Sequence, residues 1–499
     1  AGSHVTRPGY LPMVYAAVDA MIAVTETPGL ERTFPTLAQR DDVRAFREGL
    51  LDIEHRLDQR KRQNEDLNRF EARSLLDRVM TLNDDTVQLP RAVLVFEMAQ
   101  GISDALDEFS SVIWPHDKDN FQRSTAGKFY GVGIQISLRD DRLIVVSPIE
   151  DTPALRAGIK AGDIIATVDG IDTAGWSLEQ AVRHITGPEN TAVVLGIERK
   201  GEKNLLEIPI RRAEIVIQSV KGWRHLPEGG WDYYIDPDNR IGYIRLTQFI
   251  PQSVDDIDDA VNAMEQGAGL NGLILDMRFN PGGLLSSAVD IADRFIEHGT
   301  IVSTTGSAHE APRFRARPER TYRRMPVVVL INQGSASASE IVAGALQDYQ
   351  RAIILGARSF GKGSVQDLYP IDGNDAYLKL TTQYYKLPGG RIIHREPGAA
   401  KWGIEPDLVV RMTSDQVADL IEYQLEADIL RDEAQDAEDH QPIDAPADDA
   451  VAADDGLPAD RSPDGILRHG LDPQVAAALL VLRTQMLTHD GALARRDEP

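Results

Sequence analysis

Between residues 231 and 410 the chain alternates short, continuously apolar segments with amphipathic ones. The apolar segments predict buried strands, and the amphipathic segments, with an apolar residue every three to four positions, predict helices. The strand candidates are IGYIRL (241–246), GLILDMRF (272–279), MPVVVLIN (325–332) and AIILGA (352–357), and the helix candidates are VDDIDDAVNAMEQ (254–266), SSAVDIADRFIEHG (286–299) and SASEIVAGALQDY (337–349). This alternation predicts an α/β domain whose sheet is covered by helices, followed by antiparallel strands in AYLKLTTQYYKLPGGRII (376–393).

The remaining regions have other patterns. Residues 129–212 hold short β-like segments between turn residues, which is typical of a small mixed domain. Residues 10–80 are mainly helical, with an imperfect apolar stripe of Leu50, Ile53, Leu57, Leu67, Phe70 and Leu75, and RAVLVFEMAQGISDALDEF (91–109) predicts a further helix. Because DQRKRQNED interrupts this stripe, a surface helical subdomain is favoured over a helical dimerisation element. Near the end, DPQVAAALLVLRTQML predicts an amphipathic helix with Val475, Leu479, Leu482 and Met486 near one face.

The acidic excess of the chain is concentrated in one segment. The formal net charge is −25, which argues against general binding of nucleic acid or anionic membrane. Eleven of the acids, with no Lys or Arg among them, lie between residues 432 and 460: Asp432, Glu433, Asp436, Glu438, Asp439, Asp444, Asp448, Asp449, Asp454, Asp455 and Asp460. The expected organisation is a helical region at 5–125, a mixed domain at 126–213, an α/β core at 214–431, a solvated acidic linker at 432–465 and a C-terminal helix at 466–490.

Two further features of the composition limit the chemistry and the compartment. The absence of cysteine excludes disulfides, cysteine nucleophiles and thiolate metal sites, but it assigns no compartment. The chain opens AGSH without an initiator methionine, which is typical of a processed or engineered N-terminus, so residues 1–4 are left out of the fold prediction. No apolar segment approaches the length of a membrane span.

The segment GSASASE (334–340) places serines between a predicted strand and a predicted helix. Such a turn presents ligand-contacting groups at the edge of an α/β sheet, and the helix N-terminus offers unpaired amides to developing negative charge. Ser337 is therefore a candidate nucleophile. On this segment alone, the safer interpretation is that Ser337 or Ser339 is an N-cap, with Glu340 complementing the helix dipole.

A serine nucleophile needs a base, and the sequence offers a lysine. No G-x-S-x-G elbow between a strand and a helix and no obvious histidine partner is found. Lys362 lies between glycines in FGKGSVQ (360–366), where burial would lower its pKa so that the neutral amine accepts a proton. If this segment is extended, Lys362, Ser364 and Gln366 share one face, and Gln366 can orient the amine. The alternative is a solvated surface lysine.

The third element is NPGG at the end of the strand candidate 272–279. The backbone amide of Gly282 or Gly283, together with that of Ala338, is a candidate oxyanion hole. No cofactor is required by this chemistry, and the histidines show no H-E-x-x-H or comparable metal-ligand spacing.

Taken together, these segments resemble the carboxyl-terminal processing (tail-specific) serine proteases over most of residues 106–410. The matching motifs are LDEFSSVIWP, FYGVGI, SPIEDTPALRAGIKAGDIIATVDG, IGYIRLTQF, LILDMRFNPGG, INQGSASASEIVAGALQD, FGKGSVQ and WGIEPD. The resemblance implies Ser337 as nucleophile, Lys362 as base, Gln366 as its orienting residue, and the amides of Ala338 and Gly283 as oxyanion donors. It also implies a crotonase-like α/β protease core and a location in the periplasm or otherwise outside the cytoplasm.

The segment from about 127 to 212 is similar to the PDZ domain of these proteases. Successive backbone amides in GVGI can capture a peptide's C-terminal carboxylate while the peptide adds to the sheet edge. The implied carboxylate loop consists of Tyr130, Gly131, Val132, Gly133 and Ile134. The implied substrates are proteins or peptides with exposed nonpolar C-termini, and further hypotheses are a homo-oligomer formed through the terminal helical regions and an activating partner protein.

The sequence departs from the family pattern at several places. Thr186 in HITGPENT stands where the family often has an arginine, LDEFS replaces the typical LDPHS, and HREPGAAK (394–401) is longer than usual. We expect the LDEFS change to affect packing more than chemistry. The competing hypotheses are a catalytically silent PDZ scaffold, a related α/β fold that handles acyl-CoA, and an intact protease gated by its PDZ domain. The spacing of Ser337, Lys362 and Gln366 favours the active protease.

Overall fold

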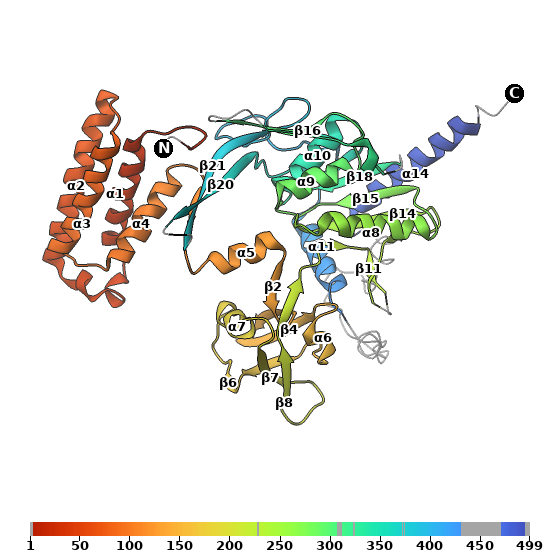
Figure 1. The fold of residues 1–499 in the computed structure, drawn as a ribbon, viewed down its shortest axis with the longest axis horizontal. Helices are drawn as coiled ribbons and strands as arrows, with labels where there is room; N and C mark the ends of the chain where they lie inside the picture. The colour runs from red at the N-terminus through yellow and green to blue at the C-terminus, as the bar shows by residue number, and fades with distance from the viewer. Residues whose placement is uncertain are drawn as a thin grey trace, which may run out of the picture.

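The computed structural model describes residues 3–226, 229–306, 312–322, 325–371, 373, 375–430 and 471–494. The predicted acidic linker at 432–465 and the start of the predicted C-terminal helix at 466–470 lie outside these residues. Figure 1 shows a helical unit at the N-terminal end, a small mixed domain and a larger α/β core. Among the described residues, none of the helices is long and apolar enough to cross a membrane.

The N-terminal unit is helical, as the sequence predicted. Its helices are α1 (Tyr10–Glu26), α2 (Arg40–Gln63), α3 (Arg69–Asp85) and α4 (Arg91–Asp104), with short 3-10 turns at Leu30–Arg32 and Pro35–Ala38. The charged segment that interrupts the apolar stripe, residues 58–66, forms the end of α2 and the start of the corner that leads to α3. There Asn64 adopts the left-handed conformation that ends α2, and the Asn68 side chain caps α3.

The helical unit has a core of its own, and one residue of the predicted stripe is outside it. Leu50, Ile53, Leu57 and Leu67 are buried and Leu75 is partly buried against them. Phe70, however, is 83% exposed, so its assignment to the buried stripe was wrong. The corner at residues 64–68 resets the helical phase, and the stripe of α2 does not continue into the first turn of α3.

The mixed domain contains an antiparallel sheet in the order β3-β4-β5-β7-β8. These strands are β3 (Ile134–Arg139), β4 (Arg142–Pro148), β5 (Ile164–Val168), β7 (Ala192–Glu198) and β8 (Leu206–Arg211), with β6 (Ile171–Asp172) paired to β5. Its helices are α6 (Pro153–Arg156) and α7 (Leu178–Ile185), and a ribbon of β2 (Lys128–Gly131) and β9 (Ala213–Val216) joins the domain to the core. Since β3 pairs only with β4 among the described strands, β3 is an edge strand.

The α/β core is built on a largely parallel sheet in the order β10-β14-β15-β18-β19-β22, with β13 paired to β14. The strands are β10 (Val220–Lys221), β13 (Tyr234–Asp236), β14 (Ile241–Leu246), β15 (Gly272–Asp276), β18 (Val327–Ile331), β19 (Ile353–Gly356) and β22 (Leu408–Val409). Pairing is parallel from β14 through β22, which agrees with the predicted alternation of strands and helices.

Helices cover both faces of this sheet because its strands are apolar on both sides. Leu273 and Leu275 of β15 pack in a cluster with α8 (Ser253–Gln266), α9 (Leu285–Asp293) and α10 (Ala338–Asp348). Ile274, which points to the opposite face, packs in a second cluster with α14 (Pro473–Ala494) and Tyr423 of α11 (Ser414–Ala427). The predicted apolar face of the C-terminal helix is confirmed, since Val475, Leu479 and Leu482 are buried and Met486 packs beside them.

A second, antiparallel sheet has the order β1-β21-β16-β17, with β20 also paired to β21. Its strands are β1 (Ser111–Ile113), β16 (Thr300–Gly306), β17 (Arg313–Arg315), β20 (Ser364–Ile371) and β21 (Ala376–Lys386). Figure 1 shows β20 and β21 reaching from the core toward the helical unit. Elsewhere, α5 (Lys118–Ala126) leads from β1 to β2, and β11 (Arg224–His225) pairs with β12 (Trp231–Asp232) beside the core.

The C-terminal helix is fastened to the core by a buried ion pair. Arg278, which follows β15, donates to Asp276 at 2.6 Å and to Asp472 at 2.8 Å, and its other amino group donates to Gln474 at 3.1 Å. The side chains of Arg278 and Asp276 have no exposed surface. Because Arg278 directly precedes the turn 279–283, α14 supports the strand that ends at this turn.

Candidate active site

The serine segment forms the turn between β18 and α10, where the sequence predicted it. Ser335 and Ser339 are fully buried, and their hydroxyl groups donate to the carbonyl oxygens of Met277 (2.8 Å) and Asn280 (3.0 Å). Ser337 is the N-cap residue of α10 and is 7% exposed. Of the three serines, Ser337 is therefore the one whose hydroxyl is not held by the neighbouring turn.

The backbone of Ser337 is strained. Its φ of 55° and ψ of −112° lie in a region that residues with a side chain rarely adopt. The neighbouring residues hold it there: the Ala336 N–H donates to the Asn280 carbonyl at 3.0 Å, and the Ser337 N–H donates to Glu340 at 2.8 Å. A sharp turn of this kind lifts the serine side chain out of the chain path at the N-terminus of the helix.

Glu340 joins the serine turn to the lysine segment. Its Oε2 atom accepts the backbone N–H groups of Ser337 and Lys362, both at 2.8 Å. Its Oε1 atom accepts the Gly361 N–H at 2.7 Å and the Ser359 hydroxyl at 2.5 Å. Burial raises the pKa of this inaccessible carboxyl group, although the hydrogen bonds act against the rise. Each oxygen accepts two donors, an arrangement that suits the carboxylate form.

Lys362 is half-buried, and its amine lies beside an aromatic ring. Its Nζ atom is 5.0 Å from the centroid of the Phe109 ring. Burial lowers the pKa of Lys362, and the positive charge of Lys379 lowers it further, whereas Glu340, Asp107 and Glu108 act in the opposite direction. The net direction is downward, as expected for a lysine that can accept a proton. The solvated surface lysine is therefore not what this structure contains.

Gln366 does not contact the Lys362 amine. Its amide donates to the hydroxyl groups of Ser364 at 2.9 Å and Thr381 at 3.2 Å. In the described part of the chain, no hydrogen bond joins Gln366 to Lys362. The expected direct contact is therefore absent here. The pairing of β20 with β21 shifts register between Val365 and Gln366, so the regular alternation on which that expectation depended is broken.

The turn that follows β15 packs directly against the serine turn. A Cβ atom added at Gly282 would lie 2.8 Å from the Cβ of Ser337 and 3.0 Å from the Ala338 nitrogen. At Gly283, where φ is 147°, an added Cβ would lie 2.1 Å from the Phe249 carbonyl oxygen. Within the described residues, neither the Gly283 N–H nor the Ala338 N–H donates a hydrogen bond. These two free amides flank Ser337, as an oxyanion hole requires.

Tyr385 is a site residue that the sequence analysis missed. It lies on β21, is buried, and has a hydrogen bond with the side chain of Ser337. Burial raises the pKa of Tyr385 to about 12, and the hydrogen bond to Ser337 opposes this rise. The phenol therefore stays protonated at neutral pH and contacts the hydroxyl group of the candidate nucleophile.

Asp107 and Phe109 in LDEFS are also nearer the site than the sequence suggested. Asp107 accepts the Thr381 hydroxyl at 3.0 Å and hydrogen bonds with His4 at 2.6 Å. His4 is buried, although residues 1–4 were left out of the fold prediction. Because the Phe109 ring lies beside the Lys362 amine, the LDEFS segment contributes to the environment of the candidate base as well as to packing. Its position before β1 gave no signal of this contact.

The predicted carboxylate loop lies where β2 turns into the edge strand β3. Tyr130 and Gly131 pair with Glu214 and Ala213 of β9, while the N–H groups of Val132 and Gly133 donate no hydrogen bond within the described residues. An added Cβ at Gly133, which has a φ of 83°, would lie 2.2 Å from the Cβ of Thr152. Ile134 begins β3, beside α7. Two free amides next to an unpaired strand edge are suited to a terminal carboxylate.

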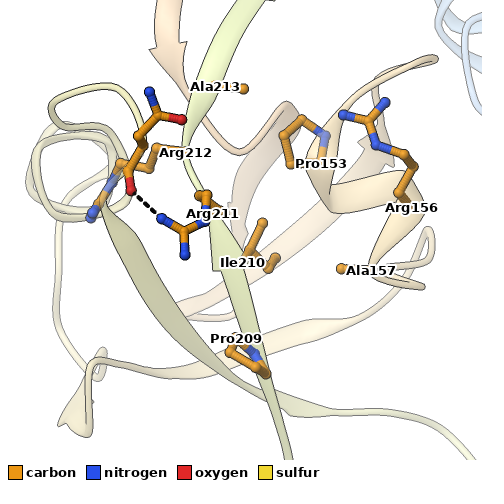
Figure 2. Close-up of a pocket in the computed structure, with 9 residues that line it drawn as sticks. Pro153, Arg156, Ala157, Pro209, Ile210, Arg211, Arg212 and Ala213 are labelled. Atoms are coloured by element: carbon orange, nitrogen blue, oxygen red, sulfur yellow. Dashed lines mark hydrogen bonds between the residues drawn. The ribbon is translucent and has the colours of Figure 1, made fainter.

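A separate pocket of about 390 Å³ opens on another part of this domain, between α6 and the end of β8 (Figure 2). It is lined by Pro153, Arg156, Ala157, Asn190, Pro209, Ile210, Arg211, Arg212 and Ala213. Arg211 donates to the Asn190 carbonyl at 2.8 Å beside this pocket. None of the predicted loop residues or candidate catalytic residues lines this pocket, so we do not assign substrate binding to it.

Comparison with protein families matches two parts of the chain. Residues 240–410 match the family model described as Peptidase family S41, and residues 131–210 match that of the PDZ domain. The first match contains Ser337, Glu340 and Lys362, and the second contains β3 and α7.

Curated relatives extend the similarity over both domains. The chain is 40% identical over 335 residues to a carboxy-terminal-processing protease of Bartonella bacilliformis, covering 66% of this chain and 71% of the relative. It is 37% identical over 333 residues to a carboxyl-terminal-processing protease of Synechocystis, covering 65% of this chain and 74% of the relative. Among solved structures, a photosystem II D1 C-terminal processing protease has 28% identity and a TM-score of 0.38, covering 64% of this chain and 82% of that one.

Proposed function

The chain belongs to the carboxy-terminal-processing protease family, and from this membership we propose that it is a serine endopeptidase with Ser337 as nucleophile and Lys362 as general base. The observation that carries the proposal is the Glu340 carboxylate, one oxygen of which accepts the N–H groups of both residues. A shared acceptor fixes the two backbone segments relative to each other, as a catalytic pair requires.

The proposed reaction uses groups of the chain alone. Neutral Lys362 Nζ accepts the proton of Ser337 Oγ as this oxygen bonds to the carbonyl carbon of the substrate peptide. The negative charge that develops on the carbonyl oxygen is held by the N–H groups of Gly283 and Ala338. When the peptide C–N bond breaks, the lysine proton passes to the leaving amine. Water then attacks the acyl-enzyme ester and gives a proton to Lys362. When the ester C–O bond breaks, Lys362 passes this proton to Ser337 Oγ, which releases the carboxylic acid and restores the serine hydroxyl and the neutral amine.

Gln366 has a supporting role in this proposal. It is held by Ser364 and Thr381, and Thr381 is in turn bound to Asp107. A change of side-chain torsion would bring its amide to the Lys362 amine when substrate fills the site, because hydrogen bonds of an empty catalytic site often tighten only on binding.

The PDZ domain is proposed to select substrates by their C-terminal tails. The tail would add as a strand to β3, with its carboxylate at the amides of Val132 and Gly133 and its nonpolar last side chain beside α7. The net charge of −25 favours protein substrates over nucleic acid partners.

Several parts of the proposal depend on the family resemblance alone. They are the crotonase-like classification of the core, a location in the periplasm or otherwise outside the cytoplasm, assembly of copies through the terminal helical regions, and stimulation by an activating partner protein.

The test compares wild type with Ser337→Ala and Lys362→Ala on an unfolded protein with a nonpolar C-terminus, with mass spectrometry to identify the fragments. We expect cleavage by wild type and a loss of at least about 100-fold in each variant, because a general base contributes about 10²–10⁴. Lys386→Ala, at an exposed lysine of β21, is the matched control and should cleave normally. An undiminished rate for Lys362→Ala would refute lysine as the base.

One observation favours a second candidate, an intact protease that is gated. In the described residues the Lys362 amine lies over Phe109 and makes no hydrogen bond to Ser337. If wild type cleaves nothing alone but cleaves after a candidate activating partner is added, the gated protease is supported. If it binds C-terminal peptides but never cleaves, the silent PDZ scaffold is supported.

A further inference from the structure

Lys379 is a second lysine near the candidate base, and it has no assigned role. It lies on β21, opposite Ser111 of β1 and Leu368 of β20, and is half-buried. Within the described residues its amine has neither a hydrogen bond nor an ion pair. An unpaired, half-buried ammonium group is unusual in a chain with 78 acidic and 53 basic residues.

The sheet places Lys379 in the same cluster as the base. Two residues further along β21, on the same face, Thr381 accepts a hydrogen bond from Gln366 and donates one to Asp107. The segment that begins at Asp107 then runs through Phe109, whose ring lies beside the Lys362 amine, to Ser111, the partner of Lys379. Both lysines therefore lie beside the same short segment, residues 107–111: the Lys362 amine at Phe109, and Lys379 opposite Ser111.

The charges around the two amines come from several elements. Asp107 and Glu108 lie on the segment beside them and Glu340 on α10, and all three act to raise the pKa of Lys362. Burial lowers the pKa of Lys362 most, and the charge of Lys379 is the next largest effect in that direction. Burial also lowers the pKa of Lys379, against the effect of Asp107.

Asp107, the acid that acts on both lysines, already has other hydrogen-bond partners. Asp107 is engaged by the Ser110 hydroxyl at 2.8 Å and by His4 at 2.6 Å, besides Thr381. The centroid of the His394 ring lies 6.0 Å from that of Phe109 and 4.8 Å from that of Tyr384, and burial lowers the pKa of His394. Lys379 is thus the second basic side chain beside residues 107–111.

We propose that Lys379 is a positioning residue that acts through Lys362, by placing a second positive charge in the cluster that favours the neutral, proton-accepting amine of Lys362. The inference rests on the proposed function, since it assigns a partner to the general base. Placing one ammonium group near another is an effective way to keep a catalytic lysine deprotonated.

The first experiment measures the amine of Lys362 without using catalysis. Ser337→Ala protein is trace-labelled with acetic anhydride over a range of pH, and mass spectrometry follows acetylation of Lys362. In the double variant with Lys379→Met the midpoint should move to higher pH, so that labelling on the acid side falls about threefold to tenfold. Lys379→Arg, which keeps the charge, should leave the midpoint in place. Lys379→Gln is the second neutral variant in case the methionine disturbs folding, and Lys386→Met is the control.

The second experiment follows kcat/KM against pH in the proteins that retain Ser337. The acid limb of the profile should move to higher pH in Lys379→Met and stay in place in Lys379→Arg. The value of kcat/KM on the high-pH plateau should be unchanged in both variants. A lowered plateau with an unmoved limb would mean a structural or substrate-binding role and would overturn the inference, as would an unmoved labelling midpoint. Full activity of Lys362→Ala would instead overturn the proposed base, whatever the labelling result.

Discussion

Replacement of Glu340 by glutamine is the sharpest test of how this site is held together. The carboxylate accepts hydrogen bonds from Ser337, Lys362, Gly361 and Ser359, two on each oxygen. Glutamine has the same shape, but an NH2 group replaces one of the oxygens. In one orientation this NH2 meets the N–H groups of Ser337 and Lys362, and in the other it meets the Gly361 N–H and the Ser359 hydroxyl.

The expected magnitude follows from counting donors that lose their acceptor. The second orientation is preferred because the Ser359 hydroxyl can turn and accept one NH2 hydrogen, which leaves two donors, the Gly361 N–H and the other NH2 hydrogen, facing each other without an acceptor. A buried unpaired donor costs about 1–3 kcal/mol, and removal of a desolvated charge offsets part of that cost. We therefore expect a loss of about 2–4 kcal/mol in unfolding free energy. Activity should fall by about 100-fold, since shifts near 1 Å in a catalytic group have such effects.

Two measurements test this. Urea unfolding is followed in the Ser337→Ala background, and kcat/KM is measured in the protein that retains Ser337. Glu71→Gln is the matched control, because Glu71 forms a similar capping box with Asn68 on the exposed start of α3. The control should leave kcat/KM unchanged. Wild-type stability and wild-type kcat/KM in Glu340→Gln would refute the view that this carboxylate couples the serine turn to the lysine segment.

Two further predictions use glycines with a matched partner elsewhere. Gly282→Ala would place a Cβ 2.8 Å from that of Ser337, so kcat should fall by about 100-fold or more. The control Gly390→Ala, where φ is 82° and the nearest atom to the new Cβ is at 3.7 Å, should only lower the unfolding midpoint. A normal kcat for Gly282→Ala in steady-state kinetics would contradict this prediction. Gly133→Ala would place a Cβ 2.2 Å from Thr152 and should weaken binding of a nonpolar C-terminal peptide by about tenfold or more, measured by fluorescence anisotropy. The control Gly158→Ala, which has a similar φ and open space around the new Cβ, should bind the peptide normally. Equal affinities of the two variants would rule out the loop at 130–134 as the carboxylate site.

The order of the core elements was predictable because parallel strands buried on both faces, such as 272–276 and 327–331, must be continuously apolar. The serine turn could be predicted because it lies where an apolar strand pattern gives way to a helical one. The lysine segment could be predicted because glycines flank Lys362 in an otherwise strand-like sequence. Glu340 was read only as a complement to the helix dipole, because its bonds to Gly361 and Lys362 depend on how distant segments meet. The hydrogen bonds of Gln366 to Ser364 and Thr381 could not be foreseen, because a register shift between two strands is not visible in the sequence of one of them.

The strained conformation of Ser337 has a consequence for the history of such a chain. Glycine adopts a φ of 55° and a ψ of −112° with less strain than serine does, so replacing Ser337 by glycine would stabilise the fold. Under the proposed role of Ser337, selection for cleavage acts against selection for a stable fold at this position. In lineages where cleavage no longer matters, drift should replace this serine with glycine more often than with alanine, and a survey of inactive descendants would reveal that bias.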